Sequence, residues 1–413
     1  MDVGAVANAD AAGHGKPLDG VRVLSIEQMQ SLPYATQLLA RLGADVVKVE
    51  HPVRGDLGRG AAPGVVDASG AHVGATYLRN NLSKRSITID LKRRAGQDLV
   101  LGMAPGFDVF AENSKPGSMA EFGLDYAPVI AAHPAVVYLS VSGFGTDGDS
   151  PYAAWPAYAP IAEAMAGLYD LNRTEDEPVR VSPVGALGDT GTALFAVIGI
   201  LAALRHRDRT GEGQHVDVAM FDSMVAFGDI VPNYWSLGKD PRTPTPIINH
   251  GFPISTGEVV IQVGREHQFA RLAESIGQPD WVDDPRFADR TGWLTHIDTI
   301  RRAVAEWADT MTPTEVADRL ALAGIAAAPV FGAADVVGDA HVATRNMLMA
   351  IPRHDGVDQP VLTPGNPIKL SNMAEGPDTE PPLLGAHTDE VLRDELGLDD
   401  DALSRLRDDG VIS

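Results

Sequence analysis

The chain contains no cysteine, and this absence excludes disulfides, cysteine metal sites and thiolate nucleophiles. A long apolar run is also missing, because the longest one, residues 193–204, is too short to cross a bilayer. The N-terminal segment has neither a basic stretch nor a sustained apolar one, unlike a signal peptide. We therefore expect a soluble, cytoplasmic protein with no membrane partner.

Basic residues are scarce: 33 lysines and arginines stand against 56 aspartates and glutamates, which gives a net charge of -23. General binding of nucleic acid needs a basic face, so we expect no nucleic-acid partner. Apolar residues make up 44 % of the chain, which is typical of a globular protein. A length of 413 residues is enough for two or three domains.

Strand-like and helix-like segments alternate over the first half of the chain. The expected strands are residues 21–26, 45–49, 86–91, 109–111, 136–141 and 215–220. The expected helices include residues 34–42, 126–132, the apolar segment after residue 189, and 221–235. Apolar strands separated by helices predict a parallel sheet covered on both faces, as in Rossmann-like proteins.

The second half predicts a smaller α/β unit between two proline-rich connectors, residues 241–246 and 355–384. Helices at 388–396 and 402–408 are expected to close the chain. The expected organisation is a disordered tail at 1–16, a large Rossmann-like domain at 17–225, a small domain at 226–335, and a return to the large domain at 336–413.

Sequence motifs for resident cofactors are weak. Residues 143–148 match a dinucleotide fingerprint after a strand, but no helix begins directly after them, so we expect no NAD site. The twelve histidines are scattered and form no metal-binding spacing. We expect neither a metal nor a permanently bound cofactor.

One carboxylate stands out. Asp189 lies between Gly188 and Gly191 at the start of an apolar helix. The glycines would let a bulky substrate approach, and the helix N-terminus would help keep the carboxyl ionised. That setting suits a carboxylate that attacks an acyl group. The alternative is a helix N-cap, which is a favoured position for aspartate.

A basic cluster interrupts the acidic background. Its members are His51, Arg54, Arg59, Arg79, Lys84, Arg85 and Lys92. They lie near the carboxyl ends of expected strands or their connections, where open α/β sheets bind ligands. A phosphate-bearing ligand is one interpretation, and solvated surface charge is the other.

Several motifs occur in a fixed order along the chain. They comprise residues 17–24, 42–50, 81–92, 111–113, 116–117, 139–145, 188–191, 210–219 and 383–392. With these motifs the chain resembles the class III CoA-transferases from about residue 17 to the end. That family includes formyl-CoA transferase and L-carnitine CoA-transferase, with 2-methylacyl-CoA racemase as a relative.

The resemblance implies an activity, its substrates and its residues. Asp189 corresponds to the catalytic aspartate, which carries an aspartyl mixed anhydride and an aspartyl-CoA thioester. An acyl-CoA and a free carboxylic acid are the implied substrates. Coenzyme A would contact Gln30, Ser31, His51, Lys84, Asn113 and Tyr158. The basic cluster adds Arg54 to these expected contacts. The resemblance also implies an interlocked homodimer of ring-like subunits, with the two proline-rich connectors as arms of each ring.

The sequence departs from the family at three places. Glu121 stands where some members carry an arginine near the CoA phosphates, with Lys115 nearby to compensate. Residues 249–255 replace the glycine-rich loop of formyl-CoA transferase, which argues against formyl or oxalyl transfer. The related racemases pair the aspartate with a histidine, which residues 153–160 lack. A racemase is therefore the second hypothesis, and a non-catalytic CoA-binding paralogue is the third.

Overall fold

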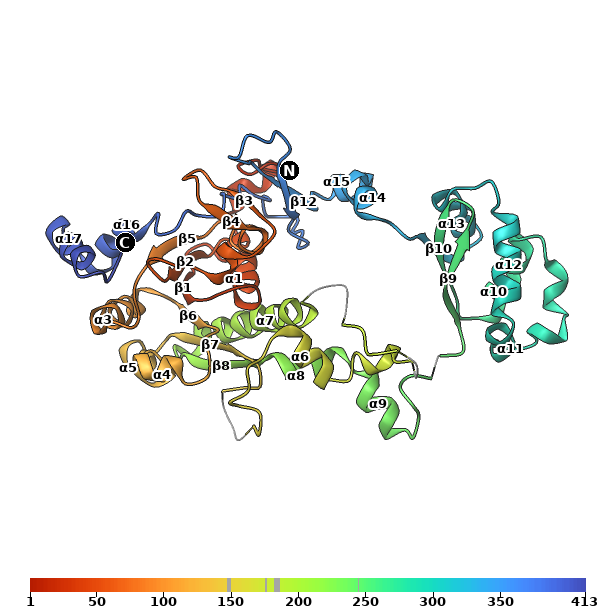
Figure 1. Cartoon of the computed structure of the whole chain (residues 1–413), viewed down its shortest axis with the longest axis horizontal. Coiled ribbons are helices and arrows are strands. Elements are labelled where there is room, and N and C mark those ends of the chain that lie inside the picture. Colours follow the sequence, from red (N-terminus) through yellow and green to blue (C-terminus); the bar gives the residue numbers. More distant parts are fainter. Residues whose placement is uncertain (147–149, 175–176, 182–185, 244) are drawn as a thin grey trace. The chain divides into compact units, whose positions relative to one another are not determined.

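The computed structural model describes residues 1–146, 150–174, 177–181, 186–243 and 245–413, which form two compact units (Figure 1). Unit 1 comprises Met1–Ser236 with Ala343–Ser413, and unit 2 comprises Leu237–Val342. For comparison, the sequence predicts a small domain at residues 226–335. Gly148 of the nominal dinucleotide motif lies outside the described residues.

Unit 1 is built on a six-stranded sheet in the order β5-β2-β1-β6-β7-β8. The strands are β1 (Arg22–Ile26), β2 (Asp45–Glu50), β5 (Arg85–Thr88), β6 (Val109–Glu112), β7 (Val137–Ser142) and β8 (Gln214–Ala219). Every neighbouring pair in this sheet is parallel. The predicted parallel α/β sheet is confirmed.

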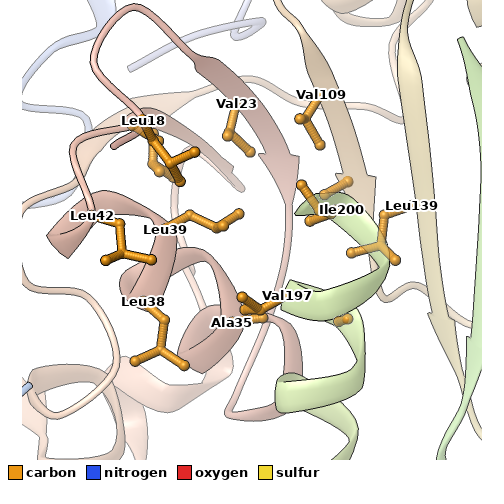
Figure 2. Close-up of a cluster of buried hydrophobic side chains, with 14 of the residues drawn as sticks. Leu18, Val23, Ala35, Leu38, Leu39, Leu42, Val109, Leu139, Val197 and Ile200 are labelled. Carbon is orange, nitrogen blue, oxygen red and sulfur yellow. The ribbon is translucent and has the colours of Figure 1, made fainter. Parts of the chain in front are cut away.

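One face of the sheet packs against α1 (Ser31–Arg41) and α7 (Leu187–Thr210). Figure 2 shows this core, with Leu38 and Leu39 of α1 and Val197 and Ile200 of α7 beside Val23, Val109 and Leu139 of the strands. α7 continues through the polar residues 205–210 and ends before Gly211. By length and composition α7 could cross a membrane, although its longest apolar run was expected to be too short, and half of its apolar window is buried inside the structure.

The other face packs against helices from both ends of unit 1. They are α3 (Arg94–Met103), α4 (Ser118–Phe122), α5 (Tyr126–Ala132), α16 (Thr388–Leu396) and α17 (Asp400–Asp408). Leu24, Phe110 and Tyr138 point into this second core, whereas their neighbours Val23 and Val109 point into the first. Successive strand residues alternate between faces, so a buried parallel strand is apolar throughout.

Smaller elements complete unit 1. They are β3 (Gly64–Val66), β4 (His72–Gly74), α2 (Ala75–Leu78), α6 (Ala159–Met165), α8 (Met220–Phe227), α9 (Ile230–Ser236), β12 (Leu348–Ile351) and β13 (Val361–Pro364). The helix expected at 221–235 is divided into α8 and α9 at Gly228. A side chain at Gly228 would meet Leu168 at 2.8 Å.

The first residues differ from the expected disordered tail. The Met1 ammonium donates to the carbonyl of Leu348 at 2.8 Å, and Asp2 bridges Ala350. Ala7 pairs in both directions with Glu375, and a 3-10 helix spans Ala9–His14. The bonds that hold these residues join their backbone to that of the C-terminal segment, and the sequence pattern does not reveal such partners.

Unit 2 contains a three-stranded antiparallel sheet in the order β11-β10-β9. Its elements are β9 (Ile248–Ile254), β10 (Gly257–Val263), α10 (Glu266–Ser275), α11 (Arg290–Thr295), α12 (Ile297–Trp307), α13 (Pro313–Leu322), β11 (Ala326–Pro329) and α14 (Ala333–Gly338), followed by α15 (Ala340–Thr344). Stacked aromatic rings, including Phe269 and Trp293, fill its core.

Candidate active site

Asp189 lies in the first turn of α7, as the third residue of the helix. The residue before the helix is Ala186, in the left-handed region with φ 53°, and no side chain caps it. The N-cap alternative for Asp189 is therefore wrong. Because an acidic side chain in a first turn needs no capping geometry, Asp189 is free to serve another role.

The glycines around Asp189 serve helix packing. A Cβ on Gly188 would lie 2.9 Å from the Ala159 Cα of α6, and one on Gly191 would lie 2.7 Å from the ring of Phe227 in α8. Real Cβ atoms do not approach so closely, so a side chain at Gly188 would displace the backbone of α6 and one at Gly191 would displace the Phe227 ring. The sequence argument assigned this space to a bulky substrate, and the structure assigns it to α6 and α8.

The electrostatic setting of Asp189 also differs from the expectation. Burial raises the pKa of the Asp189 carboxyl to about 6, and the nearby carboxylate of Glu163 adds to the rise. The buried Glu163 accepts a hydrogen bond from the Gly188 N–H at 2.8 Å and so takes the donor at the helix start. Asp189 is therefore less stable when ionised than an ordinary aspartate, but it is still mostly ionised above pH 6.

Arg79 opposes this rise. Its guanidinium lowers the pKa of Asp189, and its own Nη2 donates to the Gln30 side-chain oxygen at 2.7 Å. Gln30 directly precedes α1, and Gln37 of α1 donates to the Arg79 carbonyl at 2.9 Å. Sequence reasoning placed Arg79 only in the general basic cluster. No local pattern marks it, because Asp189 follows more than a hundred residues later.

Asn113 and Asp56 hold the loop that ends at Gln30. The Asn113 amide oxygen accepts from the Gln28 N–H at 2.9 Å, and its nitrogen donates to the Gln28 carbonyl at 3.0 Å. Asp56 accepts from the N–H of Met29, whose φ is 64°. Asn113 was predicted to contact coenzyme A, and the structure uses its amide to fix the loop.

Ser31 begins α1, and its hydroxyl is buried without a hydrogen-bond partner among the described residues. Buried polar atoms normally have partners, so the Ser31 hydroxyl is an exception directly after Gln30.

The structure contradicts the predicted role of Lys84 as a contact of coenzyme A. Its side chain is fully buried, and its ammonium donates to Glu27 at 2.6 Å, the Pro33 carbonyl at 2.9 Å and Asn81 at 3.0 Å. A lysine ammonium has three donors, so none is left for a phosphate. Lys84 is wrong as a CoA contact because its charge is compensated within the protein.

The other predicted contacts are accessible. The His51 Nδ1 accepts from the N–H groups of Val53 and Arg54, so Nε2 carries the ring proton as a donor. Arg54 itself is exposed. Tyr158 is 70 % exposed at the residue before α6, and Lys115 and Glu121 are exposed as well. Gln30 is therefore bonded to Arg79, and Arg79 acts electrostatically on Asp189. Within the described part of the chain, no side-chain hydrogen bond or ion pair joins His51, Arg54 or Tyr158 to these three residues.

A cavity of about 260 Å³ lies at the carboxyl ends of β6 and β7. Its lining includes Glu112, Lys115, Tyr126, Ser140 and His215. Burial raises the pKa of Glu112 to about 7, and the Ser140 hydroxyl lies 3.0 Å from the His215 Nε2. Of these five residues, the sequence analysis singled out only Lys115. Over the described ranges, no three His, Asp or Glu side chains are grouped to hold a metal.

Comparison with known proteins places this geometry in context. Residues 18–388 match the family described as CoA-transferase family III. The succinyl-CoA:mesaconate CoA-transferase of Haloarcula hispanica is 35 % identical, over 92 % of this chain and 96 % of that protein. The formyl-CoA:oxalate CoA-transferase of Streptomyces avermitilis is 34 % identical, over 96 % of this chain and all of that protein.

A solved structure of similar sequence also has a similar fold. A CAIB/BAIF family protein from Brucella suis superposes with a TM-score of 0.80 at 32 % identity, covering 92 % of this chain and 100 % of that one. The family match covers most of the chain, the curated relatives are enzymes of one kind, and the fold agrees. This chain is therefore a CoA-transferase of family III.

Proposed function

We propose that this CoA-transferase moves coenzyme A from an acyl-CoA thioester to a free carboxylic acid through covalent intermediates on Asp189. The observation that carries the proposal is a half-buried carboxyl with a pKa of about 6 in the first turn of α7. A poorly solvated carboxylate is a stronger nucleophile than a hydrated one, and at neutral pH this group is mostly ionised.

The reaction proceeds in four balanced steps. An oxygen of Asp189 bonds to the acyl carbon while the C–S bond breaks, which gives a mixed anhydride and CoA thiolate. The thiolate attacks the aspartyl carbonyl, and the anhydride C–O bond breaks to release the donor acid. The acceptor carboxylate attacks the resulting aspartyl-CoA thioester and again expels thiolate. The thiolate then attacks the acceptor carbonyl, which forms the new acyl-CoA and frees Asp189.

Coenzyme A would lie over the carboxyl ends of β1 and β2. Gln30 and Ser31 would meet the thioester end, while the His51 Nε2 and the exposed Arg54 would meet the phosphates. The Nε2 donor of His51 and the exposed side chain of Arg54, both directly after β2, support this arrangement. Tyr158 would contact the acyl end. The relatives named above act with succinyl-CoA or formyl-CoA, so a short acyl group is the first donor to test.

The exposed face of α7 supports a homodimer. Leu194, Phe195, Ile198 and Leu201 are each between 36 and 60 % exposed on one helix. A contiguous apolar stripe on a soluble protein is typical of an interaction surface. We propose that a second copy of the chain covers it, in the interlocked arrangement that the sequence resemblance implies.

Trapping tests the covalent role of Asp189. The enzyme is incubated with succinyl-CoA and hydroxylamine, digested, and its peptides are mapped by mass. We expect an aspartyl hydroxamate on Asp189, and an activity that falls as the pH drops below about 6. Asp189→Asn removes both the adduct and the turnover, whereas Asp208→Asn, an exposed change near the end of the same helix, removes neither.

An adduct at another residue, or an active Asp189→Ala variant, would overturn this assignment. Incubation of a 2-methylacyl-CoA in deuterium oxide tests the racemase hypothesis, and rapid exchange at the α-carbon without CoA transfer would support it instead.

A further inference from the structure

Arg79 is a half-buried guanidinium that lacks a carboxylate partner among the described residues. The buried arginines of unit 1 show the contrast, because Arg41 pairs with Asp378 and Arg59 pairs with Glu50. Burial lowers the pKa of Arg79, which reflects the cost of keeping this cation away from water. Of its five N–H donors, one is taken by the Gln30 side chain in the described structure.

The position of Arg79 is fixed before any ligand arrives. Gln37 of α1 donates to the Arg79 carbonyl at 2.9 Å and accepts from the Leu82 N–H at 2.7 Å. The segment from Arg79 to Leu82 is therefore held at both ends by one side chain. Gln30 fixes the guanidinium itself. A preorganised arginine loses little additional freedom when it binds a carboxylate in its planar fork.

Asp189 is the acidic group that acts on Arg79 electrostatically. The two side chains influence one another without forming an ion pair, so more than 4.0 Å separates their charged atoms. When Asp189 is acylated it loses its negative charge, and Arg79 loses its anionic neighbour. An acyl group that brings a second carboxylate would restore the balance.

We propose that Arg79 binds the distal carboxylate of a short dicarboxylic acyl group while the other carboxyl is bonded to Asp189. This inference rests on the proposed function, and it makes the enzyme selective for dicarboxylic acids. Donor and acceptor acids each form an anhydride with Asp189, so each in turn presents its far end to the same guanidinium. Because Arg79 contacts the distal carboxylate, it does not bind the reacting carboxylate, whose lone pairs stay free for attack.

Isotope exchange separates the two classes of acid. We would measure the entry of ¹³C-labelled succinate into succinyl-CoA, and of labelled butyrate into butyryl-CoA, which has the same chain length without the second carboxylate. The wild-type enzyme should favour succinate. Arg79→Met should reduce kcat/KM for succinate by about 10- to 150-fold, the loss expected for a charged hydrogen-bonded pair, and reduce it far less for butyrate.

Three further variants make the result specific. Arg79→Lys keeps the charge without the fork and should retain part of the preference, which also serves if Arg79→Met does not fold. Arg94→Met removes an exposed arginine of α3 and should leave the ratio of the two acids unchanged. Added methylguanidine should restore succinate exchange to Arg79→Gly.

Two results would overturn the assignment of Arg79: a wild-type enzyme that uses butyrate as readily as succinate, or an Arg79→Met variant that loses both activities equally. Either result leaves the proposed function intact, provided the wild-type enzyme transfers CoA. An enzyme that exchanges neither acid, nor any other in a broad screen, would instead refute the proposed function.

Discussion

At the scale of single residues, the fold destabilises the charged form of Asp189. Burial and Glu163 raise its pKa, and Arg79 reduces the rise. A native pKa of about 6 exceeds the ordinary value of 3.8, so the native state binds more protons than the unfolded state between these pH values. Stability should therefore fall as the pH rises from about 4 to 6, and the full cost is present above that range.

Asp189→Asn should therefore stabilise the protein in its working pH range. At pH 8 the gain should approach about 3 kcal/mol, the equivalent of the difference between the two pKa values, and it should shrink towards pH 4. Urea unfolding at both pH values measures this difference. A variant that is less stable than the wild type at pH 8 would contradict the electrostatic account.

Lys84 carries a second prediction at this scale. Lys84→Met should lower the free energy of unfolding by about 3–5 kcal/mol, because Glu27 would stay buried without its nearest cation. Lys92→Met, an exposed change in the same motif, should have little effect. Chemical denaturation of both variants checks this. A Lys84→Met variant of normal stability that only binds acyl-CoA weakly would restore the sequence-based role.

At the scale of elements, the sequence predicted best where apolar periodicity is regular. The helix expected at 126–132 matches α5, and the strands of the parallel sheet match within a few residues. β9 was missed because it contains Gly251 and Pro253, which weaken a strand pattern. β12 and β13 were missed because each has only four residues, and β12 finds its partners in β13 and in the first residues of the chain.

The same limits apply to the site. Asp189 could be found from its own segment, but its pKa depends on Glu163 of α6 and on Arg79, which only the fold brings near. The sequence shows that Lys84 is charged, but it does not show that Glu27 lies beside Lys84 and neutralises this charge. Local residue types therefore suffice to propose Asp189 as the nucleophile, while the residues that shift its pKa are identified only in the three-dimensional structure.

At the scale of the whole molecule, the two faces of α7 have different surroundings. Its inner face belongs to the core of unit 1, and its outer face is apolar and exposed. Ile198→Asp should weaken self-association, because it places a charge in the proposed interface, whereas Leu322→Asp, at a leucine that is 91 % exposed in unit 2, should not. Sedimentation velocity at micromolar concentration measures both, and a wild-type monomer would refute the homodimer.

The edge of the large sheet has a consequence for synthesis on the ribosome. The outer edge of β5 is closed by late residues, since the N–H of Ser86 donates to the His387 ring and that of Thr88 donates to Thr388. Unit 2 emerges between these segments and has its own core. A growing chain would thus finish unit 2 while β5 still lacked its cover. Until the last helices emerge, that unpaired edge is open to other strands, and nascent-chain chaperones would find their target there.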